Sequence, residues 1–230
     1  MAIAEPRAVI DTDLRLKCVS TTMILGGSGS GKTRWALYLL THPELFKDPP
    51  ERIVLYYSQP QDGYAEAKQE LREKHGIELL LYQGFDPDLT LEKIQRSGKR
   101  TLAVFDDLTD ETFSSPNIAQ MTMASRHRNV GTMFLLHTLF HKSPASRIMT
   151  TNCHQFFFLP SIRMSAQIKT FASQIGMRNR VCSAYKDAVE VSEDPKLNEH
   201  RYLFLDLFPS REDLLRVRSR IHLPIQICWA

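Results

Sequence analysis

A glycine-rich segment near the start of the chain carries the residues best suited to chemistry. Residues 26–33 read GGSGSGKT and match the pattern GxxxxGK[ST], between a short apolar stretch and a helical one. Glycines let such a loop curl so that its backbone N–H groups point at phosphate oxygens, and the start of the following helix favours the same negative charge. We expect Lys32 to reach the β- and γ-phosphates of ATP and the Thr33 hydroxyl to ligate Mg²⁺. The predicted ATP-binding residues are Gly26, Gly27, Ser28, Gly29, Ser30, Gly31, Lys32 and Thr33. A flexible loop that matches by accident is the alternative, and the flanking elements argue against it.

Two adjacent acids follow the apolar stretch 101–105. A phosphate-loop enzyme needs a carboxylate at the end of a buried strand to hold Mg²⁺, and Asp106 is predicted to supply it. Asp107 is expected to polarise the attacking water, with Asp110 or Glu111 as substitutes. Tandem acids of this kind favour a hydrolysing ATPase over a kinase. The structural alternative is that either acid caps the turn that follows.

Short apolar stretches alternate with helical ones along most of the chain. We expect strands at 22–25, 52–57, 78–82, 101–105, 132–136 and 155–159. Helices are expected at 34–41, 64–74, 91–96, 117–127 and 165–174, and a turn or helix at about 145–149. This order predicts an α/β fold with a mostly parallel sheet sandwiched by helices. The tail is expected to add a strand at 201–207, a short helix at 212–217 and an apolar end to the same domain. A single domain, 1–230, is predicted, with a core at about 20–176 and a C-terminal extension at about 177–230.

Composition excludes several other classes of protein. The chain has 230 residues, of which 43% are hydrophobic and 24% charged, so it is neither disordered nor collagenous. Its four cysteines form no CxxC pair, which disfavours a disulfide framework or a structural zinc site. No stretch approaches the roughly 20 apolar residues of a membrane span, so we expect a protein that is neither secreted nor inserted in a membrane.

The charge is distributed unevenly. The chain has 29 Lys and Arg against 26 Asp and Glu. Residues 112–186 contain nine basic residues and no acid, which leaves 20 basic against 26 acidic residues elsewhere. Chance clustering of solvated side chains is one explanation. A surface that meets a polyanion such as DNA is the other.

The stretch 125–152, SRHRNVGTMFLLHTLFHKSPASRIMTTN, adds a family resemblance to these motifs. Residues 23–176 resemble the HerA/FtsK superfamily and are most similar to the poxvirus-type genome-packaging ATPases. In that family an Arg/His-rich helix end precedes a strand that ends in a polar sensor residue, followed by a Phe, an Arg and an Asn. The matching positions here are Arg126 to Asn129, His137 as the sensor, Phe140, Arg147 and Asn152, and the family's DD-L motif matches Asp106, Asp107 and Leu108. The sensor of the family is usually Gln, so His137 is a departure from it, and a core histidine is the alternative.

The resemblance implies a P-loop NTPase of the HerA/FtsK type, an ATP-hydrolysing translocase of double-stranded DNA that packages a viral genome into a capsid. It implies a ring of identical subunits, a capsid or portal-vertex protein as partner, no membrane, and work in the host cytoplasm or nucleus where virions assemble. The implied catalytic residues are Lys32, Asp107, His137 and Arg147. Arg147, expected in a loop after the sensor strand, would act on the neighbouring subunit's nucleotide, with Arg126 or Arg128 as alternatives.

Two other functions remain open from the sequence. One is a P-loop kinase of a nucleoside or small metabolite, for which Arg178 and Arg180 would have to close over the phosphates. The other is a nucleotide switch in which ATP only sets the state of assembly. No nuclease-like acidic cluster follows the ATPase core, which predicts translocation without cutting.

Overall fold

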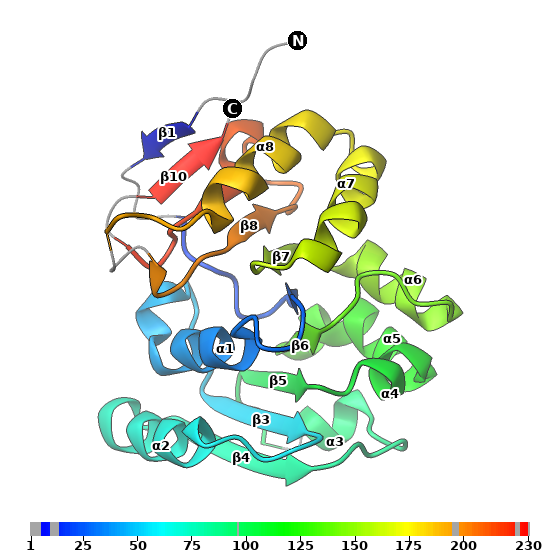
Figure 1. Cartoon of the computed structure of the whole chain (residues 1–230). Helices are drawn as coiled ribbons and strands as arrows, with labels where there is room; N and C mark the ends of the chain where they lie inside the picture. Colours follow the sequence, from blue (N-terminus) through cyan, green and yellow to red (C-terminus); the bar gives the residue numbers. More distant parts are fainter. Residues whose placement is uncertain (1–5, 10–13, 96, 195–197, 224–225, 230) are drawn as a thin grey trace.

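The computed structural model describes residues 6–9, 14–95, 97–194, 198–223 and 226–229. They form one ten-stranded sheet in the order β1-β10-β9-β8-β7-β2-β6-β5-β3-β4, with helices on both faces (Figure 1). The sheet divides into a parallel half and an antiparallel half, and the strands β7 and β8 meet at the boundary.

The parallel half has six strands that all run in the same direction. They are β7 (Gln155–Phe158), β2 (Thr21–Leu25), β6 (Val130–Leu136), β5 (Thr101–Asp106), β3 (Arg52–Tyr57) and β4 (Glu78–Gln83). Every strand predicted for this half is present, and each predicted end lies within two residues of the observed one. The prediction of a mostly parallel α/β fold is confirmed.

Helices cover both faces of the parallel half. The α-helices are α1 (Lys32–Thr41), α2 (Gly63–Glu70), α3 (Leu91–Gln95), α4 (Thr109–Ser114), α5 (Pro116–Ala124), α6 (Pro144–Asn152), α7 (Ser165–Gln174) and α8 (Arg178–Val189). Short 3-10 turns are η1 (Pro43–Leu45), η3 (Ser125–Arg128), η4 (Ile162–Met164) and η5 (Asp213–Leu215), and η2 (Leu71–His75) is a π-helical turn. The predicted helix 64–74 is therefore two pieces, and the predicted helix 117–127 ends in a 3-10 turn.

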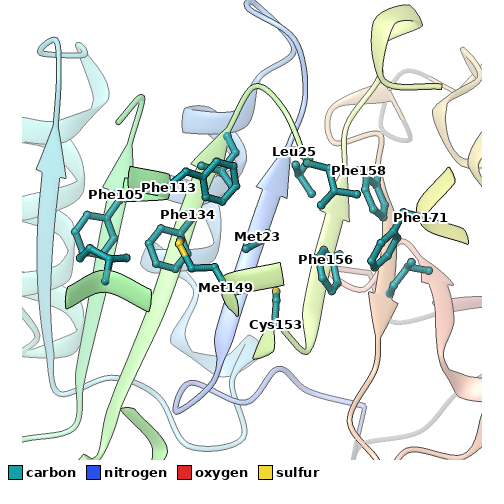
Figure 2. Close-up of a cluster of buried hydrophobic side chains, with 14 of the residues drawn as sticks. Met23, Leu25, Phe105, Phe113, Phe134, Met149, Cys153, Phe156, Phe158 and Phe171 are labelled. Carbon is teal, nitrogen blue, oxygen red and sulfur yellow. The ribbon is translucent and has the colours of Figure 1, made fainter. Parts of the chain in front are cut away.

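Alternate residues of each strand enter separate cores on the two faces. On one face, Met23 and Leu25 of β2 pack with Phe156 and Phe158 of β7 beneath α4, α6 and α7 (Figure 2). On the other face, Ile24 contributes to the core under α1 and α2. Burial of both faces explains why these strands are continuously apolar. It also fixes the register in which neighbouring strands pair.

The antiparallel half is built from the C-terminal extension and one N-terminal strand. Its strands are β8 (Leu203–Asp206), β9 (Val217–Ser219), β10 (Gln226–Trp229) and β1 (Pro6–Val9). The predicted helix at 212–217 is wrong beyond Leu215, because Val217 is buried and begins β9. Helix α8 and strand β1 were not predicted from the sequence.

A buried ion pair holds this half together. Asp206 Oδ2 accepts hydrogen bonds from Arg218 Nη2 at 2.9 Å and Arg211 Nε at 2.8 Å, and Arg218 is fully buried. Arg218 also donates to the Leu14 carbonyl at 2.7 Å, which joins the N-terminal segment to the extension. Burial lowers the pKa of Arg218 to about 10, so the guanidinium stays charged at neutral pH beside Asp206. None of the helices in the described ranges is long and apolar enough to cross a membrane.

Candidate active site at the phosphate loop

The glycine-rich loop joins the end of β2 to the start of α1, as the motif requires. Gly31 caps α1 with a φ of +87°, a left-handed conformation that favours glycine. A Cβ atom on Gly26 would lie 3.0 Å from Ser30 Cβ and 3.2 Å from Leu159 Cβ, which is tighter than carbon atoms usually pack. The shape of the loop therefore depends on glycine at both positions.

Lys32 lies inside this loop. Its Nζ donates hydrogen bonds to the carbonyl oxygens of Gly26 and Gly27, each at 3.0 Å. It also lies 3.2 Å from Nδ1 of His137, which follows β6. Burial lowers the pKa of Lys32, and the charges of Asp106 and Asp107 oppose that shift. The lysine is thus held where the loop, the acidic strand end and the sensor position meet.

Asp106 is the last residue of β5 and is 4% exposed. Its Oδ2 accepts hydrogen bonds from the Thr33 hydroxyl at 2.7 Å and from the Tyr64 hydroxyl at 2.8 Å. Burial raises the pKa of Asp106, and these two hydrogen bonds lower it in part. A carboxylate beside a hydroxyl is the type of hard oxygen donor set that Mg²⁺ prefers. The predicted pair of metal ligands is therefore adjacent in the structure.

Tyr64 is a site residue that the sequence does not indicate. It is buried near the start of α2, where its ring packs at 5.0 Å from that of Tyr57. Burial, with the neighbouring charge of Asp106, raises the pKa of Tyr64, so its hydroxyl remains a donor to that carboxylate at neutral pH. A tyrosine at a helix start resembles an ordinary core residue, and no local pattern marks it as a neighbour of the acid.

Asp107 adopts a left-handed backbone with a φ of +56°, which is uncommon for a residue other than glycine. Its Oδ1 lies 2.6 Å from His137 Nε2, and the Ser58 hydroxyl donates to Oδ2 at 3.4 Å. Helix α4, which follows, has no side-chain cap at its start. The alternative that these acids serve as caps is therefore wrong. Strained backbone of this kind is typical of functional sites.

His137 connects the lysine to the acid. Lysine has only donors, so Nδ1 of His137 accepts from Lys32, and the proton on Nε2 is then donated to Asp107. This tautomer is assigned from the contacts. The side chain is 39% exposed, so the alternative of a core histidine is wrong. Lys32, Asp107 and His137 form one continuous hydrogen-bonded chain, called below the Lys–His–Asp relay.

The predicted substitutes for Asp107 lie on α4 and do not join this relay. Asp110 pairs with Nε2 of His141 at 3.6 Å, and Glu111 is exposed. These contacts leave Asp107 as the acid that touches the sensor residue.

Arg147 lies on the exposed side of α6 and not in a loop, which corrects the sequence-based expectation. It makes no ion pair with any carboxylate of the described ranges, and it lines a groove of about 680 Å³. Asn152 donates back to the Ile148 carbonyl of its own helix at 2.8 Å. Phe140 and Arg128 are exposed. The side chain of Arg126 lies outside the described part of the structure.

Of the two arginines proposed for a kinase-type lid, Arg180 serves a different purpose. Arg178 and Arg180 lie at the start of α8, and Arg180 donates to the Asp213 carboxylate at 2.9 Å and to the Trp229 carbonyl. Arg180 therefore ties α8 to the antiparallel half of the sheet and is not available to cover a nucleotide. This weakens the kinase alternative.

Comparison with known proteins agrees with this geometry. A search of curated proteins found no significant match. Among solved structures, the genome packaging NTPase B204 from Sulfolobus turreted icosahedral virus 2 has a similar fold. Its complex with ATP-gammaS superposes with a TM-score of 0.52 at 13% identity, covering 84% of this chain and 94% of the other. Its complex with AMP gives a TM-score of 0.54 at 14% identity, covering 91% and 100%. The family model described as poxvirus A32 protein matches residues 12–157. Since that match spans more than half of the sequence, this P-loop ATPase belongs to the poxvirus A32 protein family.

Proposed function

We propose that the protein uses ATP hydrolysis to move double-stranded DNA into a viral capsid. The observation that carries the proposal is the Lys–His–Asp relay, which joins the phosphate loop to an acid and to a sensor residue on the neighbouring strand. Membership of the poxvirus A32 family and the fold shared with a viral genome packaging NTPase support the packaging role.

The loop residues 26–33 would hold the triphosphate of ATP, and Lys32 would turn from the loop carbonyls to the β- and γ-phosphates. Thr33 and Asp106 would hold Mg²⁺, for which their adjacent oxygens are suited. When bound, the ion neutralises charge that develops on the phosphate oxygens. Tyr64 keeps Asp106 in place by donating to the same carboxylate oxygen.

Asp107 would accept a proton from the attacking water as the water oxygen bonds to the γ-phosphorus and the bond to the leaving ADP oxygen breaks. Its position is fixed by the hydrogen bond from His137 and by the left-handed backbone. Because His137 also contacts Lys32, movement of the lysine toward phosphate changes the partners of the histidine. The relay thereby couples occupation of the loop to the position of the acid.

We further propose that the subunits form a ring in which Arg147 completes the neighbouring site. An arginine that acts in this way must be exposed and free of a local carboxylate, and Arg147 satisfies both conditions within the described ranges. Arg126 and Arg128 remain the alternatives.

The acid-free segment 112–186 is the proposed DNA-facing part of the ring. Among its basic residues with described side chains, seven are exposed: Arg128, Lys142, Arg147, Arg163, Lys169, Arg178 and Lys186. Phosphate contacts by such residues give salt-dependent affinity without reading sequence. A capsid or portal-vertex protein is the proposed second partner, at sites of virion assembly in the host cytoplasm or nucleus.

ATP hydrolysis measured with and without long duplex DNA tests this function. A translocase is expected to be stimulated severalfold by duplex DNA, and Asp107→Asn is expected to lower the stimulated rate by about a hundredfold. A kinase would need a small acceptor, and a switch would turn over negligibly in both conditions. Either of those results would contradict the proposal.

A further inference from the structure

A buried hydroxyl from outside the sequence motifs contacts the proposed metal site. Tyr64 lies on the first turn of α2 and is 4% exposed, and its ring belongs to the core under α1 and α2. Its hydroxyl donates a hydrogen bond to Oδ2 of Asp106 at 2.8 Å. The Thr33 hydroxyl donates to the same oxygen at 2.7 Å. One carboxylate oxygen therefore accepts hydrogen bonds from two helices, α1 and α2.

The two donors differ in what a bound nucleotide requires of them. Thr33 ends the phosphate-loop motif and is a proposed ligand of Mg²⁺, so its hydroxyl oxygen would have to face the ion. Tyr64 is no part of the loop, and neither ATP nor the ion requires its hydroxyl. Of these two contacts of Asp106, the one from Tyr64 is therefore the one that can persist unchanged when the site is occupied.

Packing holds the Tyr64 hydroxyl in this position. The ring lies 5.0 Å from that of Tyr57, the residue of β3 that pairs with Asp106 of β5. Side chains packed in a core are held in single rotamers by their neighbours. Asp106 is itself 4% exposed, and a buried carboxylate is costly unless it is hydrogen-bonded. Tyr64 is thus a fixed donor to a group that needs one.

We propose that Tyr64 is a positioning residue for the bound divalent cation. It holds the Asp106 carboxylate in place while Thr33 turns toward the ion, and it thereby strengthens metal binding without touching the metal. Partners that orient a metal ligand in this way typically change metal affinity by about 10–100-fold. This inference rests on the proposed function, because it requires ATP and Mg²⁺ at the phosphate loop.

The affinity of a non-hydrolysable ATP analogue, with and without Mg²⁺, isolates the contribution of the metal. Calorimetry with AMPPCP is run once in saturating Mg²⁺ and once in EDTA, and the ratio of the two affinities is the enhancement by the metal. In Tyr64→Phe, which removes only the hydroxyl, this enhancement is expected to fall by about tenfold or more. The affinity in EDTA is expected to equal that of the unaltered protein.

Tyr57→Phe is the matched control. It removes a hydroxyl from the ring that packs on Tyr64, and within the described residues that hydroxyl makes no hydrogen bond to Asp106. Both affinities of the control should match those of the unaltered protein. Since each substitution keeps its aromatic ring, a thermal melting curve of each variant checks that the core is intact.

A double variant tests whether Tyr64 acts through Asp106. Asp106→Asn alone is expected to remove most of the enhancement by Mg²⁺, because it takes the charge from the metal ligand. Adding Tyr64→Phe to it should then cause no further loss of affinity in Mg²⁺ or in EDTA, whereas independent effects would add. General weakening of the core by Tyr64→Phe would not depend on the residue at position 106.

Three results would overturn the inference and leave the phosphate site standing. Unchanged enhancement in Tyr64→Phe would show that the hydroxyl does not act on the metal. Equal losses in Mg²⁺ and in EDTA would show that it supports the loop instead, and additive losses in the double variant would show that it acts apart from Asp106. Failure of AMPPCP to bind the unaltered protein in either condition would refute the phosphate site itself, and the proposed function with it.

Discussion

In the parallel half of the sheet, strands β2, β5 and β6 end at one edge, and residues at those ends form the candidate active site. In the antiparallel half, the strands are three or four residues long, and Asp206 and Arg218 form a buried ion pair between β8 and β9. The proposed catalytic residues and the buried ion pair thus lie in different parts of one sheet. The contrast predicts different effects for polar substitutions: those at the strand ends of the parallel half should change nucleotide chemistry, and those in the buried ion pair of the antiparallel half should change the free energy of unfolding.

The largest effect is expected from Lys32→Ala. Loss of the loop cation should abolish tight ATP binding, and hydrolysis with it, because hydrogen bonds to charged groups are among the strongest in proteins. Thermal unfolding should change little, since the buried ammonium is itself costly to keep. Calorimetry measures the affinity for ATP, and a thermal melting curve measures the stability of the variant. Wild-type affinity in the variant would refute the assignment of the loop.

Arg147→Ala is expected to bind ATP normally and hydrolyse it about a thousandfold more slowly, the low end of the effect of arginines acting across an interface. Mixing it with Lys32→Ala should restore activity at interfaces where an intact arginine faces an intact loop. Steady-state hydrolysis of the mixture measures this recovery. If the two variants co-assemble without recovery, Arg147 does not act across the interface, and Arg126 and Arg128 are the next candidates.

In the antiparallel half, Asp206→Asn should destabilise the protein by about 3–5 kcal/mol, because it leaves a buried guanidinium without its charge partner. Asp206 is 1% exposed. The control is Asp213→Asn, whose side chain is 77% exposed although it also pairs with an arginine, Arg180. It should cost less than about 1 kcal/mol. Urea unfolding measures both, and equal costs would show that burial of the pair is not what stabilises this half.

The two halves also differ in how far the sequence predicts them. Strands of the parallel half are apolar stretches buried on both faces, and the loop residues and Asp106 follow from local spacing, so these are predictable. Strand β9 contains Arg218, whose polarity opposes a buried strand unless Asp206 is known to face it. Tyr64 is likewise out of reach, because its contact with Asp106 spans 42 residues and depends on packing of α2. Local sequence patterns thus predict the loop and the strands, and they do not predict contacts between side chains that lie far apart in the sequence.

The smallest effect is expected from His137→Gln, which tests the role of the Lys–His–Asp relay. In His137→Gln, the amide oxygen can accept from Lys32 and the amide nitrogen can donate to Asp107, as the imidazole does now. Hydrolysis should therefore stay within about threefold of the unaltered rate, because no hydrogen bond of about 1 kcal/mol is lost. His137→Ala removes both contacts and should separate hydrolysis from stimulation by DNA.

Comparison of these two variants shows whether the relay requires an imidazole at position 137 or only a side chain that hydrogen-bonds to both Lys32 and Asp107. Rates with and without duplex DNA, measured on the same preparations, give the coupling directly. If Gln is as harmful as Ala, then bridging two partners is not sufficient, and the imidazole has a chemical role that an amide cannot fill. If Ala also leaves DNA stimulation intact, then the contact between Lys32 and His137 does not couple the loop to the acid, and the chemistry of the parallel half resides in Lys32, Asp106 and Asp107 alone.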